Sequence, residues 1–419
     1  MALSHTEQRV VDVVVIGGGA AGMMAAGRAA EQGKSVLLLE KNADLGKKLL
    51  ITGGGRCNIT NNKTDTREML AKYKGNDKFL FSAFSQFDVE AALAFFHERG
   101  CPTKEENEGR MFPVSNSSQS VYDVLYTYMK QGNVEIRKSS IVSGLKLPKS
   151  GDGIIVQTKS GNDFYAKSCI LATGGTSRPE TGSTGEAFMW LKKLGHTIIE
   201  NDVALVPVAL TDLWVKKISG LSFEEVKLTT FQHNQKQESY KGKLLFTHFG
   251  ISGPMVLNMS KDIGELLKYG DVTIALDLFP KIDNGTLKQR LQTVLVEESN
   301  KKLKNVLSRL VPASFVSVVL ALAEIDGETP NHSVSSEDRV KLVRQMKEIQ
   351  LHVKGLLGKD KAVVSSGGVM LTEVDFKTMQ SRVVPNLYLI GDVLNIDRPS
   401  GGYSLQLCWT TGYVAGSNC

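Results

Sequence analysis

Cysteine is scarce in this sequence. Only five of its 419 residues are cysteines, and no two of them form a Cys-x-x-Cys pair or lie close together in the chain. These residues are Cys57, Cys101, Cys169, Cys408 and Cys419. The sequence therefore indicates neither a disulfide framework nor a zinc site, and we expect no bound metal.

Targeting signals are also missing. The opening residues, MALSHTEQRV, lack the pattern of a signal peptide. The apolar residues 10–30 are interrupted by Asp12, Arg28 and five glycines, which argues against a transmembrane helix. A hydrophobic content of 42% and a net charge of +6 are ordinary for a globular protein. We expect a soluble, cytoplasmic protein with no membrane partner and room for two or three domains.

The strongest pattern lies in residues 11–40. The apolar run at 11–16 predicts a parallel strand that is buried on both faces. Gly17-x-Gly19-x-x-Gly22 follows at once, and an alanine-rich stretch then predicts a helix that ends at Gly33. A second apolar strand, at 36–39, leads to Glu40. This order of strand, glycines, helix, strand and acid is typical of a dinucleotide-binding unit.

Each part of this unit has a physical role. Gly17 allows the tight turn, Gly19 lets the backbone approach a pyrophosphate, and Gly22 permits close contact between helix and strand. The amino terminus of the helix offers free N–H groups to the phosphates. Glu40 is placed to accept hydrogen bonds from the ribose hydroxyls, which argues against a 2′-phosphate. The alternative is a strand–helix–strand unit whose glycines serve packing alone.

A second glycine cluster, Gly53–Gly55, is followed directly by Arg56, Cys57 and Asn58. Three consecutive glycines indicate that the backbone passes close to another group, which in a dinucleotide protein is the rest of the cofactor. We assign Arg56 to the phosphates and Cys57 to the wall of the site. A surface loop is the alternative.

Three later segments return the chain to the cofactor. The backbone near Val142 is predicted to meet adenine, and Ala172-Thr173-Gly174 is a second strand-to-glycine turn. Gly391-Asp392 ends a buried strand, where an open α/β sheet binds its ligand, and the carboxylate is predicted to bond a ribityl hydroxyl. The last helix opens at residues 402–405, and its dipole would stabilise a negatively charged flavin edge.

The chain changes character at about residue 203. Strand-like segments precede a mainly helical stretch at 283–350. His248 lies on a loop that leads into a helix amino terminus, and it is our candidate for a contact with the substrate; a buried structural histidine is equally compatible with the sequence. Basic residues at 288–309 could touch RNA, although a solvated helix face is the commoner explanation.

Four motifs, TGGGRCN, FTHFGISGP, SSGGV and GDVLNIDRPSGGYSLQ, resemble those of the BaiN-type (YhiN-type) NAD(P)/FAD-dependent oxidoreductases, within the wider fumarate-reductase-flavoprotein-like FAD superfamily. The resemblance implies an α/β fold, with a Rossmann-like FAD-binding domain and an inserted β-barrel plus helical subdomain. We assign residues 1–202 and 366–419 to the FAD-binding domain, 203–280 and 351–365 to the barrel, and 281–350 to the helices.

The cofactor expected is non-covalent FAD. The residues predicted to contact it are Gly17, Gly19, Ala21, Gly22, Glu40, Lys41, Gly54, Arg56, Cys57, Asn58, Val142, Ala172, Thr173, Gly174, Gly391, Asp392, Gly402, Tyr403, Ser404 and Leu405. His248 and Tyr403 are the candidate proton donors. No second Gly-x-Gly-x-x-Gly unit is present, so NADH or NADPH would bind only transiently over the flavin.

The predicted function is hydride transfer through flavin N5 on a small organic substrate, with an enone or another C=C bond suggested by the resemblance. Two alternatives stay open. One is an FAD-dependent RNA-modifying enzyme, although nucleic acid is the less expected partner, and the other is a flavin-binding redox module without catalysis. The sequence leaves the substrate and the oligomeric state undetermined.

Overall fold

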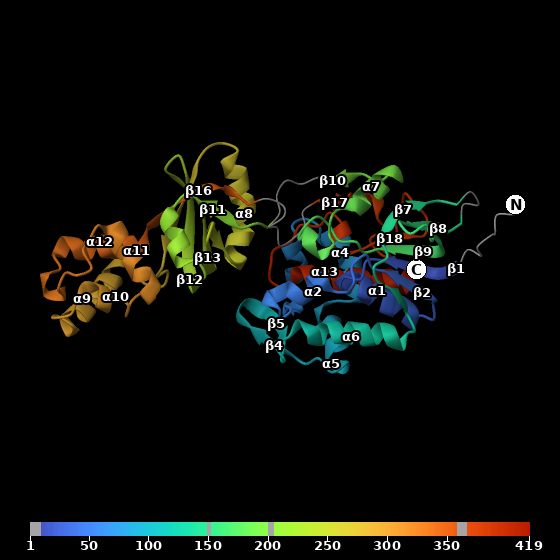
Figure 1. Cartoon of the computed structure of the whole chain (residues 1–419), viewed down its shortest axis with the longest axis horizontal. Coiled ribbons are helices and arrows are strands. Elements are labelled where there is room, and N and C mark those ends of the chain that lie inside the picture. Colours follow the sequence, from blue (N-terminus) through green and yellow to red (C-terminus); the bar gives the residue numbers. More distant parts are fainter. Residues whose placement is uncertain (1–9, 149–151, 200–204, 358–366) are drawn as a thin grey trace. The chain divides into compact units, whose positions relative to one another are not determined.

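The computed structural model describes residues 10–148, 152–199, 205–357 and 367–419 (Figure 1). The chain divides into two compact units, of which the first comprises Met1–Ala204 and Ala362–Cys419 and the second Leu205–Lys361. Each unit has its own hydrophobic core. The predicted domain boundaries at 202–203 and 365–366 lie outside the described residues.

A seven-stranded sheet forms the centre of the first unit, with strand order β6-β2-β1-β9-β8-β7 and with β18 paired to β9. Its strands are β1 (Val10–Ile16), β2 (Val36–Leu39), β6 (Glu135–Arg137), β7 (Val142–Lys146), β8 (Ile154–Thr158), β9 (Phe164–Leu171) and β18 (Leu387–Leu389). Neighbours pair in parallel among β6, β2, β1, β9 and β18. Val13, Val14 and Val15 in β1 are completely buried, as expected for a strand covered on both faces.

Two helices from opposite ends of the chain pack against each other in this unit. They are α1 (Ala20–Glu31), which also contacts β1 and β2, and α13 (Tyr403–Asn418). A Cβ atom added at Gly412 of α13 would lie 2.6 Å from the Ala21 carbonyl oxygen, and one at Gly416 would lie 2.6 Å from the Ala25 oxygen. Small residues therefore let the carboxyl-terminal helix lie directly on the helix that follows the glycine turn.

The first unit contains further elements. They are α2 (Lys47–Ile51), β3 (Thr60–Asn61), α3 (Thr66–Leu70), α4 (Asp77–Gln86), α5 (Val89–Glu98), β4 (Thr103–Glu106), β5 (Arg110–Pro113), α6 (Ser118–Gln131), α7 (Glu186–Lys193), β10 (Ile198–Ile199) and β17 (Gly368–Val369). Of these, α4, α5, α6 and β3 contact the pair of helices formed by α1 and α13. One stretch of the described residues, Asp77–Glu98, is by length and composition apolar enough to cross a membrane. The stretch contains α4 and α5, and Phe84 and Phe96 within it are buried in the core, which indicates two packed helices.

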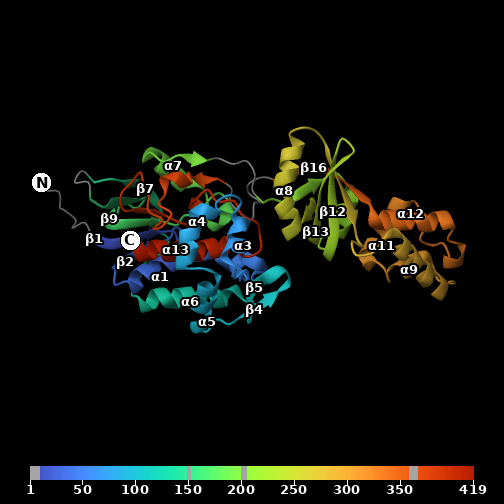
Figure 2. The same cartoon turned by 180° about the vertical axis from the view of Figure 1, so that it is seen from behind.

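The second unit is built on a closed barrel with strand order β11-β14-β13-β12-β15-β16 (Figure 2). Its strands are β11 (Val208–Leu210), β12 (Ser222–Gln232), β13 (Gln235–Thr247), β14 (Gly250–Ser252), β15 (Val272–Asp277) and β16 (Ile349–Leu356). Helix α8 (Pro254–Leu267) packs against β13 and β14, with Pro254 at its first turn. The chain thus has the predicted α/β fold with an inserted β-barrel.

Four further helices form a group between β15 and β16 in the sequence. They are α9 (Asn284–Glu297), α10 (Leu303–Leu307), α11 (Ala313–Ala323) and α12 (Ser336–Lys347). The ammonium of Lys347 joins this group to the barrel, because it donates to Asp277 Oδ2 at 2.7 Å and to the carbonyl oxygens of Phe279 at 2.8 Å and Ile282 at 2.7 Å. The helical subdomain is therefore tied to the end of β15 by a cation with three acceptors.

Candidate cofactor site

A large cavity opens in the first unit where the parallel strands end. It contains about 1190 Å³ of empty space, including its open mouth. Residues that directly follow β1, β2, β9 and β18 line it, together with α2 and the first turns of α1 and α13. Because the carboxyl ends of parallel strands meet at one edge of a sheet, this is the position at which open α/β sheets bind ligands.

The glycine turn between β1 and α1 forms the middle of the wall. Gly17 has φ +107°, and a Cβ atom there would lie 2.5 Å from the Ala172 carbonyl oxygen. A Cβ atom at Gly22 would lie 1.9 Å from the Gly17 oxygen, whereas one at Gly19 would meet no heavy atom within 4 Å. Gly17 and Gly22 are therefore required by packing inside the protein, and Gly19 leaves room on the side of the cavity.

The amino terminus of α1 has a positive electrostatic end beside this space. Gly19 is its N-cap, no side chain caps the helix, and its first turn has no acidic residue. Its first N–H groups lack partners within the helix, as at every helix amino terminus. The dipole and these N–H groups favour a negatively charged group, and a pyrophosphate has that chemistry.

Glu40 lies at one end of the cavity and is only 7% exposed. Its Oε2 accepts a hydrogen bond from Gly18 N at 2.8 Å, and its Oε1 accepts from the backbone N and the Nδ2 of Asn42, both at 2.7 Å. These donors hold the carboxylate in one orientation. Oε2 accepts only one of these bonds and keeps a lone pair, so the carboxylate could also accept from a ribose hydroxyl.

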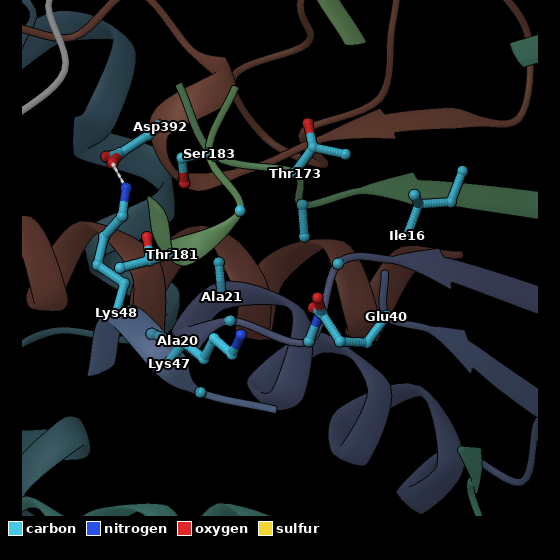
Figure 3. A pocket seen from close by; sticks show the side chains of 18 of the residues that line it. Ile16, Ala20, Ala21, Glu40, Lys47, Lys48, Thr173, Thr181, Ser183 and Asp392 are labelled. Carbon is cyan, nitrogen blue, oxygen red and sulfur yellow. Dashed lines mark hydrogen bonds and ion pairs between the residues drawn. The ribbon is translucent and has the colours of Figure 1, made fainter. Parts of the chain in front are cut away.

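Asp392 and Lys48 line the other end (Figure 3), and Arg398, which pairs with Asp392, completes a charged cluster there. The Arg398 guanidinium donates to Asp392 Oδ1, and the Lys48 ammonium lies 4.0 Å from Asp392 Oδ2. Burial by itself raises the pKa of Asp392, but the charges of Arg398 and Lys48 outweigh it, and the pKa is lowered. Burial lowers the pKa of Lys48, against the opposing effect of Asp392.

One polar atom in the cavity wall lacks a partner. The hydroxyl of Thr173 is buried and has no hydrogen-bond partner in the part of the chain that the structure describes. Buried polar groups in native proteins are normally paired, with protein or with a ligand or water. Together with the free α1 terminus and the ribose-type carboxylate, this hydroxyl fits a cavity built for a polar, phosphate-containing cofactor such as FAD.

The structure gathers most of the predicted residues from distant parts of the chain. Those that line the cavity are Gly17, Gly19, Ala21, Glu40, Lys41, Val142, Ala172, Thr173, Gly174, Gly391, Asp392, Ser404 and Leu405. Glu40 and Asp392, on which the interpretation of one extended ligand depends, face the same cavity, with Ala20 and Ala21 of α1 between them (Figure 3).

The segment after the second glycine cluster is placed differently. Arg56, assigned to the phosphates, is not among the lining residues: its guanidinium donates to Glu106 Oε1 at 2.8 Å and lies 4.1 Å from the centre of the Phe112 ring. The acid on β4 and the aromatic ring on β5 thus hold the side chain, and neither could be recognised as its partner from the sequence. Gly54 does not line the cavity either.

Cys57, Asn58, Gly402 and Tyr403 are also not among the residues that line the cavity. The Cys57 thiol is completely buried, and burial raises its pKa to about 12. When the Asn58 amide is oriented so that both its nitrogen and its oxygen have hydrogen-bond partners, the oxygen accepts from Gly402 N at 3.0 Å. This bond fixes the start of α13. Tyr403 is buried too, and its pKa is raised to about 12 by burial.

His248 belongs to the second unit, in the turn between β13 and β14. Its side chain is exposed, and its ring lies edge-on to Phe249, with the ring centres 4.9 Å apart. The alternative of a buried structural histidine is therefore wrong.

Several lining residues were not predicted, among them Asn42, Lys48, Ser140, Thr181, Ser183 and Cys408. The signal for Lys48 was its place two residues after Gly46, since a glycine with φ +67° marks a turn beside the glycine loop. Thr181 and Ser183 flank Gly182 in a segment that the sequence presented only as the approach to a helix.

The chain was compared with known proteins. The family model described as the HI0933-like protein Rossmann domain matches residues 11–418. A 3-dehydro-bile acid delta(4,6)-reductase of Clostridium scindens is 31% identical over 406 residues, which cover 96% of this chain and 97% of the relative. A ribosomal RNA dihydrouridine synthase of Escherichia coli is 29% identical over 409 residues, 96% of each chain.

Solved structures share the fold. A 3-ketosteroid delta1-dehydrogenase from Sterolibacterium denitrificans matches with a TM-score of 0.56 at 12% identity, over 97% of this chain and 98% of the other. Mycobacterium smegmatis Sdh1 in complex with UQ1 matches with a TM-score of 0.52 at 16% identity, over 98% of this chain and 68% of the other. At these identities the likeness shows a common architecture.

Proposed function

Because this chain belongs to the HI0933-like family of FAD-dependent oxidoreductases, we propose that it reduces a carbon–carbon double bond conjugated to a carbonyl group, with NADH or NADPH as the electron donor. FAD would accept a hydride from the nicotinamide and deliver it from N5 to the substrate carbon furthest from the carbonyl. A proton then completes the saturated bond. The net reaction consumes one NAD(P)H and one proton per double bond.

The observation that carries this proposal is the continuous cavity between Glu40 and Asp392. Glu40 would hold the adenosine ribose, the amino terminus of α1 the pyrophosphate, and Asp392 the ribityl chain. Along this path Thr173 offers a hydroxyl that has no hydrogen-bond partner in the described part of the chain. The residues present therefore suit the whole length of FAD.

The choice of double bond follows from the relatives. A 3-dehydro-bile acid with delta(4,6) bonds carries its C=C bonds in conjugation with a carbonyl, and so does the uracil ring that a dihydrouridine synthase saturates. The two named activities share hydride addition to a conjugated C=C bond. We therefore propose this bond type for the present chain and an unsaturated 3-oxo steroid acid as the first substrate to test.

The proton donor is proposed from two residues. Tyr403 keeps its proton at neutral pH, since its pKa is raised to about 12, and it lies in the first turn of α13 beside the cavity residue Ser404. His248 is exposed in the second unit and has no side-chain hydrogen bond among the described residues. Of the two single replacements, the one that removes the donor should reduce turnover of the double bond while flavin reduction by NAD(P)H continues.

The experiment begins with purified protein and FAD. We expect a yellow complex that NADH or NADPH reduces without oxygen and that an unsaturated 3-oxo steroid acid reoxidises. The control is the same acid with a saturated ring, which should leave the flavin reduced. A protein that stays colourless after FAD addition would contradict the cofactor, and failure of every conjugated acceptor would contradict the reaction. Turnover would also exclude a redox module without catalysis.

A second candidate is reduction of a uridine in ribosomal RNA. It is favoured by two relatives named ribosomal RNA dihydrouridine synthase, each 29% identical over 96% of this chain. Part of the basic helical surface is neutralised, since Lys302 and Lys304 both pair with Glu328. In α9, however, Lys288 and Arg290 are exposed and have no acidic partner within 4 Å in the described chain.

RNA transcripts test this candidate. A uridine-reducing enzyme should form dihydrouridine in a ribosomal RNA transcript and bind it with an affinity that falls steeply as salt rises. Replacement of Lys288 and Arg290 by glutamine should weaken that binding and leave steroid-acid turnover unchanged. Absence of both salt-dependent binding and dihydrouridine would remove RNA as the substrate.

A further inference from the structure

Lys48 occupies a fixed position in the cavity wall. It belongs to α2, whose start at Gly46 is held by a hydrogen bond from Gly46 N to Gly18 O at 2.8 Å. Leu49, the next residue, is buried in the core. The side chain of Lys48 extends toward Asp392, away from Glu40 (Figure 3). The protein thus holds an ammonium group at the Asp392 end of the cavity.

The charges around this ammonium do not cancel. The Asp392 carboxylate is already bound by Arg398, whose side chain is only 1% exposed. Lys48 lies 4.0 Å from the same carboxylate, which is beyond hydrogen-bond distance, and its Nζ donates to Ser177 Oγ at 3.2 Å. Two cations thus face the one Asp392 carboxylate, and Glu180, a more distant anion that also acts on Lys48, is itself paired with Arg178 at 3.6 Å. No other carboxylate lies within 4 Å of the Lys48 ammonium in the described residues.

We propose that Lys48 is the cation that stabilises the reduced form of FAD. This inference rests on the proposed occupation of the cavity by FAD with its flavin at the Asp392 end. Two electrons and one proton convert the oxidised cofactor to a form with one additional negative charge. The Lys48 side chain is 26% exposed, and an ammonium partly shielded from solvent interacts more strongly with that charge than an ammonium in water would. Lys48 should therefore favour reduced over oxidised FAD.

The neighbouring lysine provides a matched control. Lys47 also lines the cavity, but its side chain is exposed and its Nζ lies 3.3 Å from Asn42 Oδ1, at the Glu40 end. The two residues are adjacent in the same short helix and carry the same charge. Lys47→Gln therefore removes one positive charge from the cavity without changing the cluster around Asp392.

The test compares wild-type protein, Lys48→Gln, Lys48→Arg and Lys47→Gln, each loaded with FAD. The dissociation constant of oxidised FAD is measured by titration, and the midpoint potential by anaerobic equilibration with a reference dye. In Lys48→Gln we expect reduced FAD to lose at least tenfold more affinity than oxidised FAD, which lowers a two-electron potential by about 30 mV per tenfold. Lys48→Arg and Lys47→Gln should stay near the wild-type potential.

Two results would overturn the inference. One is an equal loss of affinity for both redox forms in Lys48→Gln, as expected if the lysine only binds a phosphate or only supports Asp392. The other is a potential in Lys48→Gln that matches that of Lys47→Gln.

If Lys48→Gln retains no FAD, Asp392→Asn decides the question. Loss of that negative charge should raise the midpoint potential, and an unchanged or lower value would refute the inference. Wild-type protein that binds FAD and turns over its substrate keeps the proposed function intact in every one of these cases.

Discussion

Replacement of Gly19 by alanine separates the stability of the fold from the binding of the cofactor. Gly19 has φ −83° and ψ −173°, an extended conformation that alanine adopts readily. The added methyl group would meet no heavy atom of the described residues within 4 Å. It would project where the amino terminus of α1 meets the cavity, which is the position that we propose for the pyrophosphate.

The expected effects differ in size. For folding, loss of glycine from an N-cap costs a few tenths of a kcal/mol or more, and the lower entropy of the unfolded chain offsets this by about 0.4–1 kcal/mol. The free energy of unfolding should therefore change by less than about 1 kcal/mol. For binding, displacement of a phosphate from one charged hydrogen bond costs about 1.5–3 kcal/mol, which is roughly ten- to hundredfold in affinity.

The assay measures both quantities on the same protein. Denaturant unfolding without FAD should coincide with wild type, and titration with FAD should show the weaker binding. Gly285→Ala is the control: Gly285 lies in α9, and a Cβ atom there would have its nearest neighbour, Asp283 Oδ1, at 3.5 Å. Wild-type affinity in Gly19→Ala would show that the phosphates do not lie against this turn and would refute the reasoning.

Other predictions concern buried groups of the first unit. Gly22→Ala should prevent folding or lower the melting temperature by many degrees, because its Cβ would lie 1.9 Å from the Gly17 oxygen; calorimetry of the soluble protein measures this. Arg398→Met should destabilise the fold by roughly 3–5 kcal/mol in urea unfolding, because it leaves the Asp392 carboxylate, which is only 15% exposed, without its hydrogen-bonded partner. Since the pKa of Asp392 is lowered in the folded state, its contribution to stability is present above its unfolded pKa and is lost as the pH falls through the folded value. In Asp392→Asn the free energy of unfolding should therefore fall less steeply with decreasing pH. A fall identical to that of the wild type would contradict this assignment. Cys57, whose pKa is raised to about 12 by burial, should react with a thiol reagent at pH 8 only after unfolding.

The first strand, glycine turn and helix could be predicted because their signals are local. The apolar run at 11–16 forms β1, and the alanine-rich stretch forms α1. Glu40 directly follows β2 and lines the cavity. Each feature follows from residues within a few positions of one another, through strand burial, turn geometry and helix formation. The same holds for Gly391-Asp392, since a buried strand followed by such a pair must end at the carboxyl edge of the sheet.

The partners of the charged side chains could not be predicted in this way. Arg56 was assigned to phosphates because it follows three glycines, but its neighbours in space are Glu106 on β4 and Phe112 on β5. Lys48 could not be distinguished from Lys47 in the sequence, because only the path of the backbone directs Lys48 toward Asp392 and Lys47 toward Asn42. Pairings across 50 to 350 residues have no signature in local sequence.

By itself, the sequence determined the type of fold and the kind of ligand, because the glycine turn, the helix behind it and the terminal acid are set by short-range sterics and hydrogen bonding. The tertiary structure alone decided which charges meet: it assembled Lys48, Asp392 and Arg398 into one cluster with an unbalanced positive charge and kept Arg56 out of the cavity. The reason is physical, since the energy of a charge depends on its burial and its neighbours in space, and both arise only when distant segments pack together.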